Sequence, residues 1–372
     1  MTLLLVKMKL WWWVSVVYIL AVPKLQNYGV GGELQVPCYY IFGDSQADNG
    51  NNNFLQTLAK ANYNPYGIDF PGGPTGRFCN GKTIFDVIAE LLGFPNYIPP
   101  FVTAGDLEIL FGANYASGSA GIREETGQHL GERISLNMQL QNHRTIISRL
   151  VQILGSENLT TQHLNRCLYS VDMGSNDYIN NYYRPTYYQT SHDYTLDQFT
   201  GLLIDQYRHQ LKVLYGYGAR KFALFGLGLL GCTPDAIDTY GTNGSTCVDF
   251  LNAASKDFNT ELISLIDELN DKHSDAKFIY IDSFGIGVNS SALGFQVTSS
   301  GCCPVSSTGE CIVDQLTCPN RSAYAFWDAF HPTEAFNIYS ATSAYRALNP
   351  SDAYPFDIRH LALLDQGTAM DN

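Results

Sequence analysis

The sequence has few basic residues and little charge of any kind. Its 372 residues include 22 Lys and Arg against 35 Asp and Glu, a formal net charge of −13, and only 15% of residues are charged. No Lys or Arg run is long enough to follow a phosphate backbone, so the sequence argues against nucleic acid as a partner. Because 45% of residues are hydrophobic, the chain can bury a large core, which excludes a disordered protein.

Two motifs that define common hydrolases are also missing. The chain has no G-x-S-x-G segment, so the nucleophile turn of the α/β-hydrolase lipases is absent. It has no H-E-x-x-H segment, so a zinc-protease site has no support. We expect the chemistry to need neither a metal nor a cofactor.

Long hydrophobic runs are confined to the amino terminus. Lys7 and Lys9 precede the apolar stretch Leu10–Val22, which is shorter than the roughly 20 residues that span a bilayer. This pattern is typical of a secretory signal peptide. We predict a signal peptide in residues 1–30, with cleavage somewhere between residues 22 and 37, and no membrane anchor afterwards. An uncleaved anchor or a buried helix is the alternative.

Glycosylation motifs and cysteines agree with export. Asn-x-Ser/Thr acceptors for N-glycosylation begin at Asn158, Asn243, Asn289 and Asn320. The nine cysteines lack the C-x-x-C pairs of a zinc site, and an oxidising compartment favours disulfides. We expect a bridge between Cys232 and Cys247 and further bridges within the segment from Cys302 to Cys318. Because nine is odd, at least one thiol stays free or pairs between chains.

Short β-rich apolar runs alternate with helical patterns, which predicts a parallel sheet covered by helices. The expected strands are Tyr39–Phe42, Leu110–Ala116, Leu168–Met173, Phe222–Phe225 and Phe278–Ile281. The expected helices are Thr83–Leu92, Leu196–Tyr215, Val248–Lys272 and Ala335–Leu348. No linker or repeat interrupts the chain, so we predict one domain. The Tyr- and Asn-rich segment Gly174–Thr195 is expected to be a loop, either facing the substrate or lying on the surface.

A candidate nucleophile follows the first expected strand. Ile41 and Phe42 run directly into Gly43-Asp44-Ser45. A serine there would lie at the carboxyl end of a strand and at a helix N-terminus, where ligand sites of open α/β sheets gather and where N–H groups favour negative charge. The alternative is that Ser45 only caps a helix.

A candidate base and its partner lie near the other end of the chain, in Trp327-Asp328-Ala329-Phe330-His331-Pro332. A hydroxyl needs a general base to become a nucleophile, and the base needs a partner that orients its second ring nitrogen. Asp328, three residues before His331, can reach back over one turn to hold Nδ1, which leaves Nε2 for Ser45. The alternatives are a buried structural histidine and the weaker pair His192-Asp193.

Two small-residue turns could stabilise an oxyanion. Asn176 follows one expected strand, and its side-chain amide can donate a hydrogen bond. Gly118 follows another, where a backbone N–H can approach the same oxygen. Each turn also has a plain structural reading, since Gly and Asn are common in turns.

Together these segments resemble the plant-type GDSL esterases/lipases of the SGNH hydrolase superfamily. The blocks that carry the resemblance, within residues 38–364, are GDSQADNGNNN, NYASGSAGI, VDMGSNDY and WDAFHP, accompanied by PTGRFCNGKTIFDVIAELLG, GLGLLGCTP and the cysteine-rich run from Gly301. The resemblance implies a three-layer α/β/α sandwich with a mainly parallel, flavodoxin-like sheet of about five strands. It implies Ser45, Asp328 and His331 as a catalytic triad. It also implies an oxyanion hole made by the backbone N–H groups of Ser45 and Gly118 and the side chain of Asn176.

Two positions depart from what similar proteins usually carry. Ser119 replaces a glycine beside Gly118, and Leu229-Leu230 replace a Pro-Ile pair. If the turn needs a positive φ at residue 119, a serine there is strained.

We therefore expect a secreted serine esterase of the cell wall or apoplast, acting on an ester of a lipid or an acylated polysaccharide. Two alternatives remain open. One is an extracellular acyltransferase that uses the same triad, and the other is a catalytically weak wall- or lipid-binding protein. We expect a histidine base to make activity fall below roughly pH 6.

Overall fold

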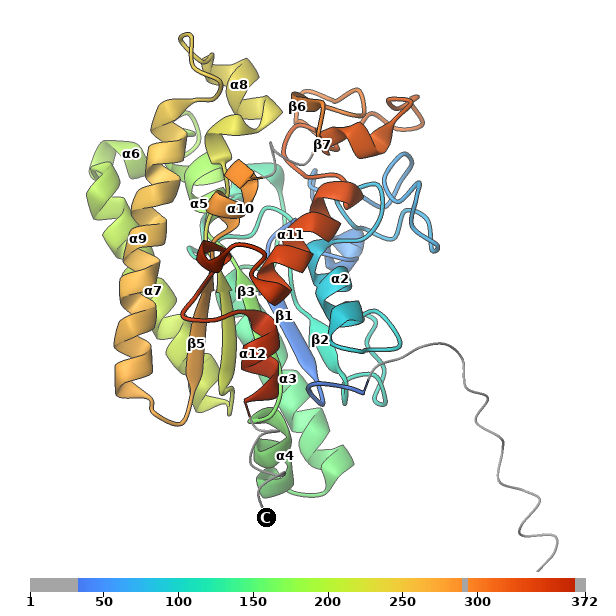
Figure 1. Cartoon of the computed structure of the whole chain (residues 1–372), viewed down its shortest axis with the longest axis vertical. Coiled ribbons are helices and arrows are strands. Elements are labelled where there is room, and N and C mark those ends of the chain that lie inside the picture. Colours follow the sequence, from blue (N-terminus) through green and yellow to red (C-terminus); the bar gives the residue numbers. More distant parts are fainter. Residues whose placement is uncertain (1–32, 290–293, 365–372) are drawn as a thin grey trace, which may run out of the picture. The chain divides into compact units, whose positions relative to one another are not determined.

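Buried apolar strands alternate with amphipathic helices in the computed structural model, which describes residues 33–289 and 294–364 (Figure 1). The predicted signal peptide, residues 1–30, lies outside the described residues. The strands are β1 (Tyr39–Gly43), β2 (Gly112–Asn114), β3 (Leu168–Asp172), β4 (Lys221–Phe225), β5 (Lys277–Ile281), β6 (Val297–Gly301), β7 (Tyr324–Phe326) and β8 (Ala353–Tyr354). The helices are α2 (Ile84–Leu91), α3 (Leu136–Leu154), α4 (Glu157–Leu164), α5 (Ser175–Asp177), α6 (Thr190–Asp193), α7 (Leu196–Gly216), α8 (Pro234–Tyr240), α9 (Asp249–Lys272), α10 (Ser283–Asn289), α11 (Glu334–Arg346) and α12 (Ile358–Leu363).

The main sheet has the strand order β2-β1-β3-β4-β5-β8. Its first five strands run parallel, and only the short β8 is antiparallel to its neighbour β5. This confirms the predicted mainly parallel sheet of about five strands. The sequence analysis did not predict β8, nor the small parallel pair formed by β6 and β7.

Helices cover both faces of this sheet, as side-chain alternation along β1 shows. Tyr40 and Phe42 belong to a core shared with α3, α7 and α9, whereas Tyr39 and Ile41 point to a core shared with α2, α11 and α12. Figure 1 shows α2, α11 and α12 gathered together. Successive strand side chains face opposite sides of a sheet, so a strand buried on both faces reads as an unbroken apolar run. The three-layer α/β/α prediction is confirmed.

The predicted helices are present to within two residues at each end. In α2, the Thr83 side chain accepts from Asp86 N while Asp86 accepts from Thr83 N, a capping box that fixes the start of the helix. The apolar stripe of α9 is buried along its length, from Leu251 to Leu269. The segment Gly174–Thr195 differs from the prediction, because short helical pieces including α5 and α6 break up the expected loop.

Four disulfides staple the described chain. The predicted Cys232–Cys247 bridge is present, and the carboxyl-terminal cluster pairs as Cys302–Cys318 and Cys303–Cys311. A fourth bridge, Cys38–Cys167, was not predicted and joins the starts of β1 and β3. Cys79 is the buried free thiol that an odd count requires.

Candidate active site

Ser45 lies in a tight turn at the carboxyl end of β1. The N–H groups of Ala47 and Asp48 donate to Asp44 O, and Gln46 N donates to Asp44 Oδ1 over 3.0 Å. The strand end was predicted correctly, but the helix N-terminus was not, since residues 44–50 form turns that lead into a short 3₁₀ segment, Asn51–Phe54. Gly43 is needed here because a Cβ would come within 2.9 Å of Asp172 O on β3.

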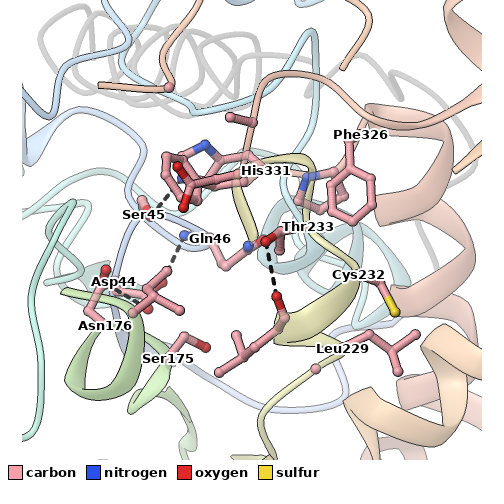
Figure 2. A pocket seen from close by; sticks show the side chains of 18 of the residues that line it. Asp44, Ser45, Gln46, Ser175, Asn176, Leu229, Cys232, Thr233, Phe326 and His331 are labelled. Carbon is pink, nitrogen blue, oxygen red and sulfur yellow. Dashed lines mark hydrogen bonds between the residues drawn. The ribbon is translucent and has the colours of Figure 1, made fainter. Parts of the chain in front are cut away.

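The imidazole of His331 connects this turn to the far end of the sequence (Figure 2). His331 Nε2 lies 2.8 Å from Ser45 Oγ, and Nδ1 lies 2.7 Å from Asp328 Oδ2. The backbone N–H groups of Phe330 and His331 both donate to Asp328 Oδ1 over 2.8 Å. The turn therefore orients the carboxylate, the carboxylate orients the ring, and the ring meets the hydroxyl. The competing pair His192 and Asp193 is exposed on α6.

Opposing effects act on the proton affinity of His331. Burial by itself lowers the pKa of this ring, but the charge and hydrogen bond of Asp328, together with the charges of Glu310 and Asp44, raise it above its ordinary value. Glu310 is buried, and this burial raises its pKa to about 7. His331 thus sits among three acidic groups that favour its protonated form.

The candidate oxyanion donors lie close to the same turn, but some are already engaged. Asn176 Nδ2 donates to Asp44 Oδ2 over 3.1 Å and to Ala120 O over 3.0 Å. The Gly118 N–H donates to Asp48 Oδ2 over 3.1 Å. The predicted role of Gly118 therefore requires its amide to leave Asp48.

The departure at residue 119 lies in the same turn. Ser119 has φ +63°, the left-handed backbone that was predicted to strain a serine. Its hydroxyl is buried and finds no hydrogen-bond partner among the described residues. Within that same part of the chain, its backbone N–H also has no acceptor. The turn thus offers a second backbone N–H, one residue after the predicted one.

Asp44 and Asp48 organise the turn around Ser45. Asp48 Oδ1 accepts the N–H groups of Gly50 and Asn51, both over 2.8 Å, and Oδ2 accepts Asn52 N over 3.2 Å. Despite these donors, burial raises the pKa of Asp48 to about 6 and that of Asp44 to about 6. Asp48 therefore holds backbone amides in place, and Asp44 holds one backbone amide and the Asn176 side-chain amide.

A cavity of about 1190 Å³ opens onto this constellation. Ser45, Asn176 and His331 line it, as do all residues at which the sequence departs from similar proteins, namely Ser119, Leu229 and Leu230. Arg184 and Tyr187 also line it, so part of the segment Gly174–Thr195 faces the cavity. This agrees with the first of the two predicted alternatives, a segment that faces the substrate. A cavity of this size accommodates a substantial ligand.

The segment Gly76–Thr83 carries the letters of a phosphate-binding loop, G-x-x-x-x-G-K-T. Such a loop follows a strand and keeps its lysine for phosphate. Here the preceding regular element is the 3₁₀ segment ending at Phe54, and the Lys82 Nζ lies 2.9 Å from the Glu90 carboxylate. Thr83 is used as the cap of α2. The surroundings therefore do not match the motif.

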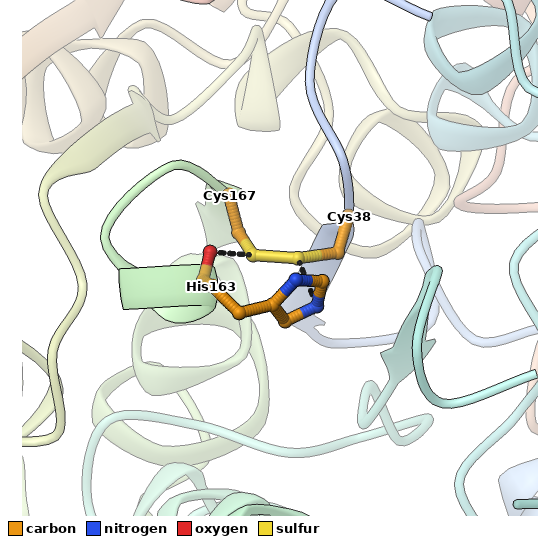
Figure 3. Close-up of side chains that lie close together, drawn as sticks. All are labelled: Cys38, His163 and Cys167. Carbon is orange, nitrogen blue, oxygen red and sulfur yellow. Dashed lines mark hydrogen bonds between the residues drawn. A yellow bond between two sulfur atoms is a disulfide. The ribbon is translucent and has the colours of Figure 1, made fainter. Parts of the chain in front are cut away.

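One cluster in the described part of the chain has metal-ligating residue types, namely Cys38, His163 and Cys167 (Figure 3). His163 Nε2 lies 3.1 Å from Cys38 Sγ, but the two cysteines are joined in a disulfide. Metals bind thiolates, and sulfurs in a disulfide have none to offer. The cluster is a structural bridge.

A hydroxyl, an imidazole and a carboxylate aligned at the carboxyl edge of a parallel sheet form the arrangement found in serine hydrolases. The family model for GDSL-like Lipase/Acylhydrolase matches residues 39–342. The chain is 54% identical to the GDSL esterase/lipase At1g29670 of Arabidopsis thaliana, over 89% of this chain and 93% of that protein. It is 52% identical to At1g29660 of the same species, over 91% and 94%.

The chain therefore belongs to the GDSL lipase/acylhydrolase family, and it is a hydrolase of ester bonds. Within the described residues, no helix is both long and apolar enough to cross a bilayer.

Proposed function

We propose that this protein is a serine esterase that hydrolyses carboxylic esters through Ser45, His331 and Asp328. The observation that carries the proposal is the contact of 2.8 Å between Ser45 Oγ and His331 Nε2, with Asp328 behind the ring. A hydroxyl in direct contact with a base that a carboxylate orients is the geometry of an activated nucleophile.

The proposed reaction proceeds in two halves. Ser45 Oγ bonds to the ester carbonyl carbon while His331 Nε2 takes its proton, and the imidazolium then protonates the leaving alcohol oxygen as the C–O bond breaks. The acyl group remains on Ser45. Water attacks this acyl-enzyme, giving a proton to His331, and Ser45 recovers its proton as the acid leaves.

A fluorophosphonate probe tests the proposal directly. Incubation should attach the probe covalently to the tryptic peptide that contains Ser45, and prior labelling should abolish hydrolysis of p-nitrophenyl acetate. An unlabelled Ser45 in a folded, hydrolytically active protein would contradict the proposal. If the folded protein is not labelled by the probe and hydrolyses no ester, the result would instead support the alternative of a catalytically weak wall- or lipid-binding protein. Net ester formation with a glycerol acceptor would support the acyltransferase.

The oxyanion is proposed to accept from the Ser45 N–H, the Asn176 side chain and an N–H of the turn formed by Gly118 and Ser119. We predict that Asn176→Ala lowers kcat by about 10²–10³-fold, the usual loss for one oxyanion donor. Steady-state hydrolysis measures it, with Asn137→Ala on α3 as the control because that residue lies outside the cavity lining. If kcat falls less than threefold, Asn176 does not stabilise the oxyanion.

The pH dependence follows from the surroundings of His331. The ring must be neutral to accept the Ser45 proton, so kcat/KM should fall as the pH drops through its pKa. Because the neighbouring carboxylates raise that pKa, the midpoint is expected above about 6.5, the ordinary histidine value, and above the limit of roughly pH 6 expected from the sequence. A pH-stat titration from pH 5 to 9 measures it. A flat rate across this range would exclude a histidine base.

Export to the cell exterior is proposed as well. Its support is the signal-peptide pattern, the four disulfides and the exposed positions of the acceptors Asn158, Asn243 and Asn320, while Asn289 is half-buried. Amino-terminal sequencing of protein collected from the culture medium of expressing cells should find a start between residues 22 and 37. Protein retained inside the cells and starting at residue 1 would contradict export.

A further inference from the structure

Tyr66 contacts the Asp328 carboxylate directly. It is fully buried in a small cluster with Phe78, Trp327 and the cysteines of the carboxyl-terminal loop. Its hydroxyl lies 2.7 Å from Asp328 Oδ2, the oxygen that also contacts His331 Nδ1. A residue 262 positions away in the sequence thus touches the proposed triad directly.

The direction of the hydrogen bonds at this hydroxyl is fixed. Cys311 N–H lies 3.1 Å from the Tyr66 oxygen, and an amide N–H can only donate. The phenol oxygen therefore accepts from Cys311 and donates its own proton to Asp328. Burial, and then the charge of Asp328, raise the pKa of Tyr66 well above its ordinary value, so the phenol stays protonated.

The loop that supplies this amide is held in place from two sides. The Cys303–Cys311 disulfide ties it to the start of the loop, and Tyr63 OH donates to Cys311 O over 2.9 Å. The phenol cannot easily turn away from Asp328 without losing the Cys311 donor. The loop therefore helps to keep the Tyr66 hydroxyl on Asp328.

We propose that Tyr66 is a positioning residue that holds Asp328 Oδ2 and shares its negative charge, and so sets both the orientation and the basicity of His331. This inference rests on the proposed function, because it assigns Tyr66 a role through the Asp328–His331 pair. A hydrogen bond to a charged acceptor in a buried setting is among the stronger ones in proteins.

Removing the phenol hydroxyl tests the role. Tyr66→Phe should lower kcat about tenfold and leave KM within about twofold, because a looser carboxylate disturbs the reacting ring rather than substrate binding. It should also move the acid limb of the kcat/KM profile to higher pH, since a carboxylate that has lost a donor stabilises the imidazolium more strongly. Glu310, Asp44 and Tyr63, the other ionisable groups around this network, are unchanged in the variant.

The matched control is Tyr39→Phe. Tyr39 is also fully buried, and its hydroxyl donates to Ser170 Oγ over 2.9 Å within the sheet. Each variant loses one buried hydroxyl, but Tyr39→Phe loses one hydrogen bond and Tyr66→Phe loses two, so Tyr66→Phe should lose somewhat more stability. Only Tyr66→Phe should move the pH profile. Equal kcat and equal acid limbs in the two variants would overturn the proposal.

An isosteric variant keeps the proposal testable if Tyr66→Phe does not fold. Site-specific 3-fluorotyrosine at position 66 retains the hydroxyl and makes it a stronger donor, because fluorine acidifies the phenol. The acid limb should then move to lower pH, opposite to the phenylalanine variant. If Ser45 still labels with fluorophosphonate but the acid limb does not move, the role proposed for Tyr66 would be wrong and the proposed function would stand. If Ser45 does not label in the unmodified protein, the proposed function itself would be wrong.

Discussion

Ser45→Ala is expected to reduce kcat for ester hydrolysis by on the order of 10⁶-fold, since removal of a nucleophile in a triad leaves only binding and oxyanion stabilisation. The variant should fold normally, because Ser45 is only half-buried and, among the described residues, its hydroxyl hydrogen-bonds only to His331. Initial rates with a soluble ester, together with a thermal unfolding curve, measure both effects.

The control for this substitution is Ser264→Ala on α9. Ser264 is exposed, and its hydroxyl donates to Thr260 O within the helix, far in sequence from either block of the site. It should retain the rate of the unmodified protein. Retention of activity in purified Ser45→Ala would mean that another residue carries the reaction, and the assignment of this cavity as the site of ester hydrolysis would fail.

Asp328→Asn is expected to lower kcat by about 10⁴-fold with little change in the fold, as when the carboxylate of a triad becomes an amide. The amide no longer stabilises an imidazolium, and it can turn its NH₂ group toward the ring and favour the wrong tautomer. Asp328 is fully buried and accepts two backbone N–H groups through Oδ1, which the amide oxygen can still accept. At the other oxygen position the amide NH₂ cannot accept the Tyr66 proton, so some stability should also be lost. A thermal unfolding curve measures that loss separately from the much larger loss of rate.

The chain contains its own control for this experiment. Asp357 and His360 have the same spacing as Asp328 and His331, and Asp357 Oδ1 lies 2.6 Å from His360 Nδ1. The His360 side chain, however, is 71% exposed, against 7% for His331. Asp357→Asn should keep full activity, because an asparagine still caps α12 and no nucleophile depends on this pair. Equal losses in both variants would point to a general effect on stability.

This second pair also shows what sequence spacing can and cannot predict. An aspartate three residues before a histidine is enough to place a carboxylate on Nδ1, since both pairs make that contact. Spacing does not tell which imidazole faces a hydroxyl. For Ser45 and His331 the convergence was predictable only because each block sits at an edge that the strand pattern and the family resemblance identify.

Two elements, α3 and β8, were not predicted from the sequence, and each has a physical reason. The helix α3 was not predicted because its buried face includes Gln139 and His143, which interrupt the apolar stripe. Gln139 is buried because it donates to Gly43 O and accepts from Gly43 N, supporting the strand end next to Ser45. The two-residue β8 is too short to show any alternation.

Pairing between distant cysteines could not be predicted either. The partners Cys38 and Cys167 are separated by 129 residues, and only the adjacency of β1 and β3 brings them together. Local spacing sufficed for Cys232 and Cys247, which are 15 residues apart. Connectivity over long separations is a property of the topology rather than of any segment.

The bridge between Cys38 and Cys167 closes a covalent ring that contains the whole segment from residue 38 to residue 167. Cleavage of the peptide backbone once anywhere inside that ring leaves both fragments attached to each other through sulfur. The strands that lead to Ser45 and toward Asn176 would then remain tethered side by side after such a cut. A nicked molecule should migrate as two pieces on a denaturing gel only after treatment with a reductant.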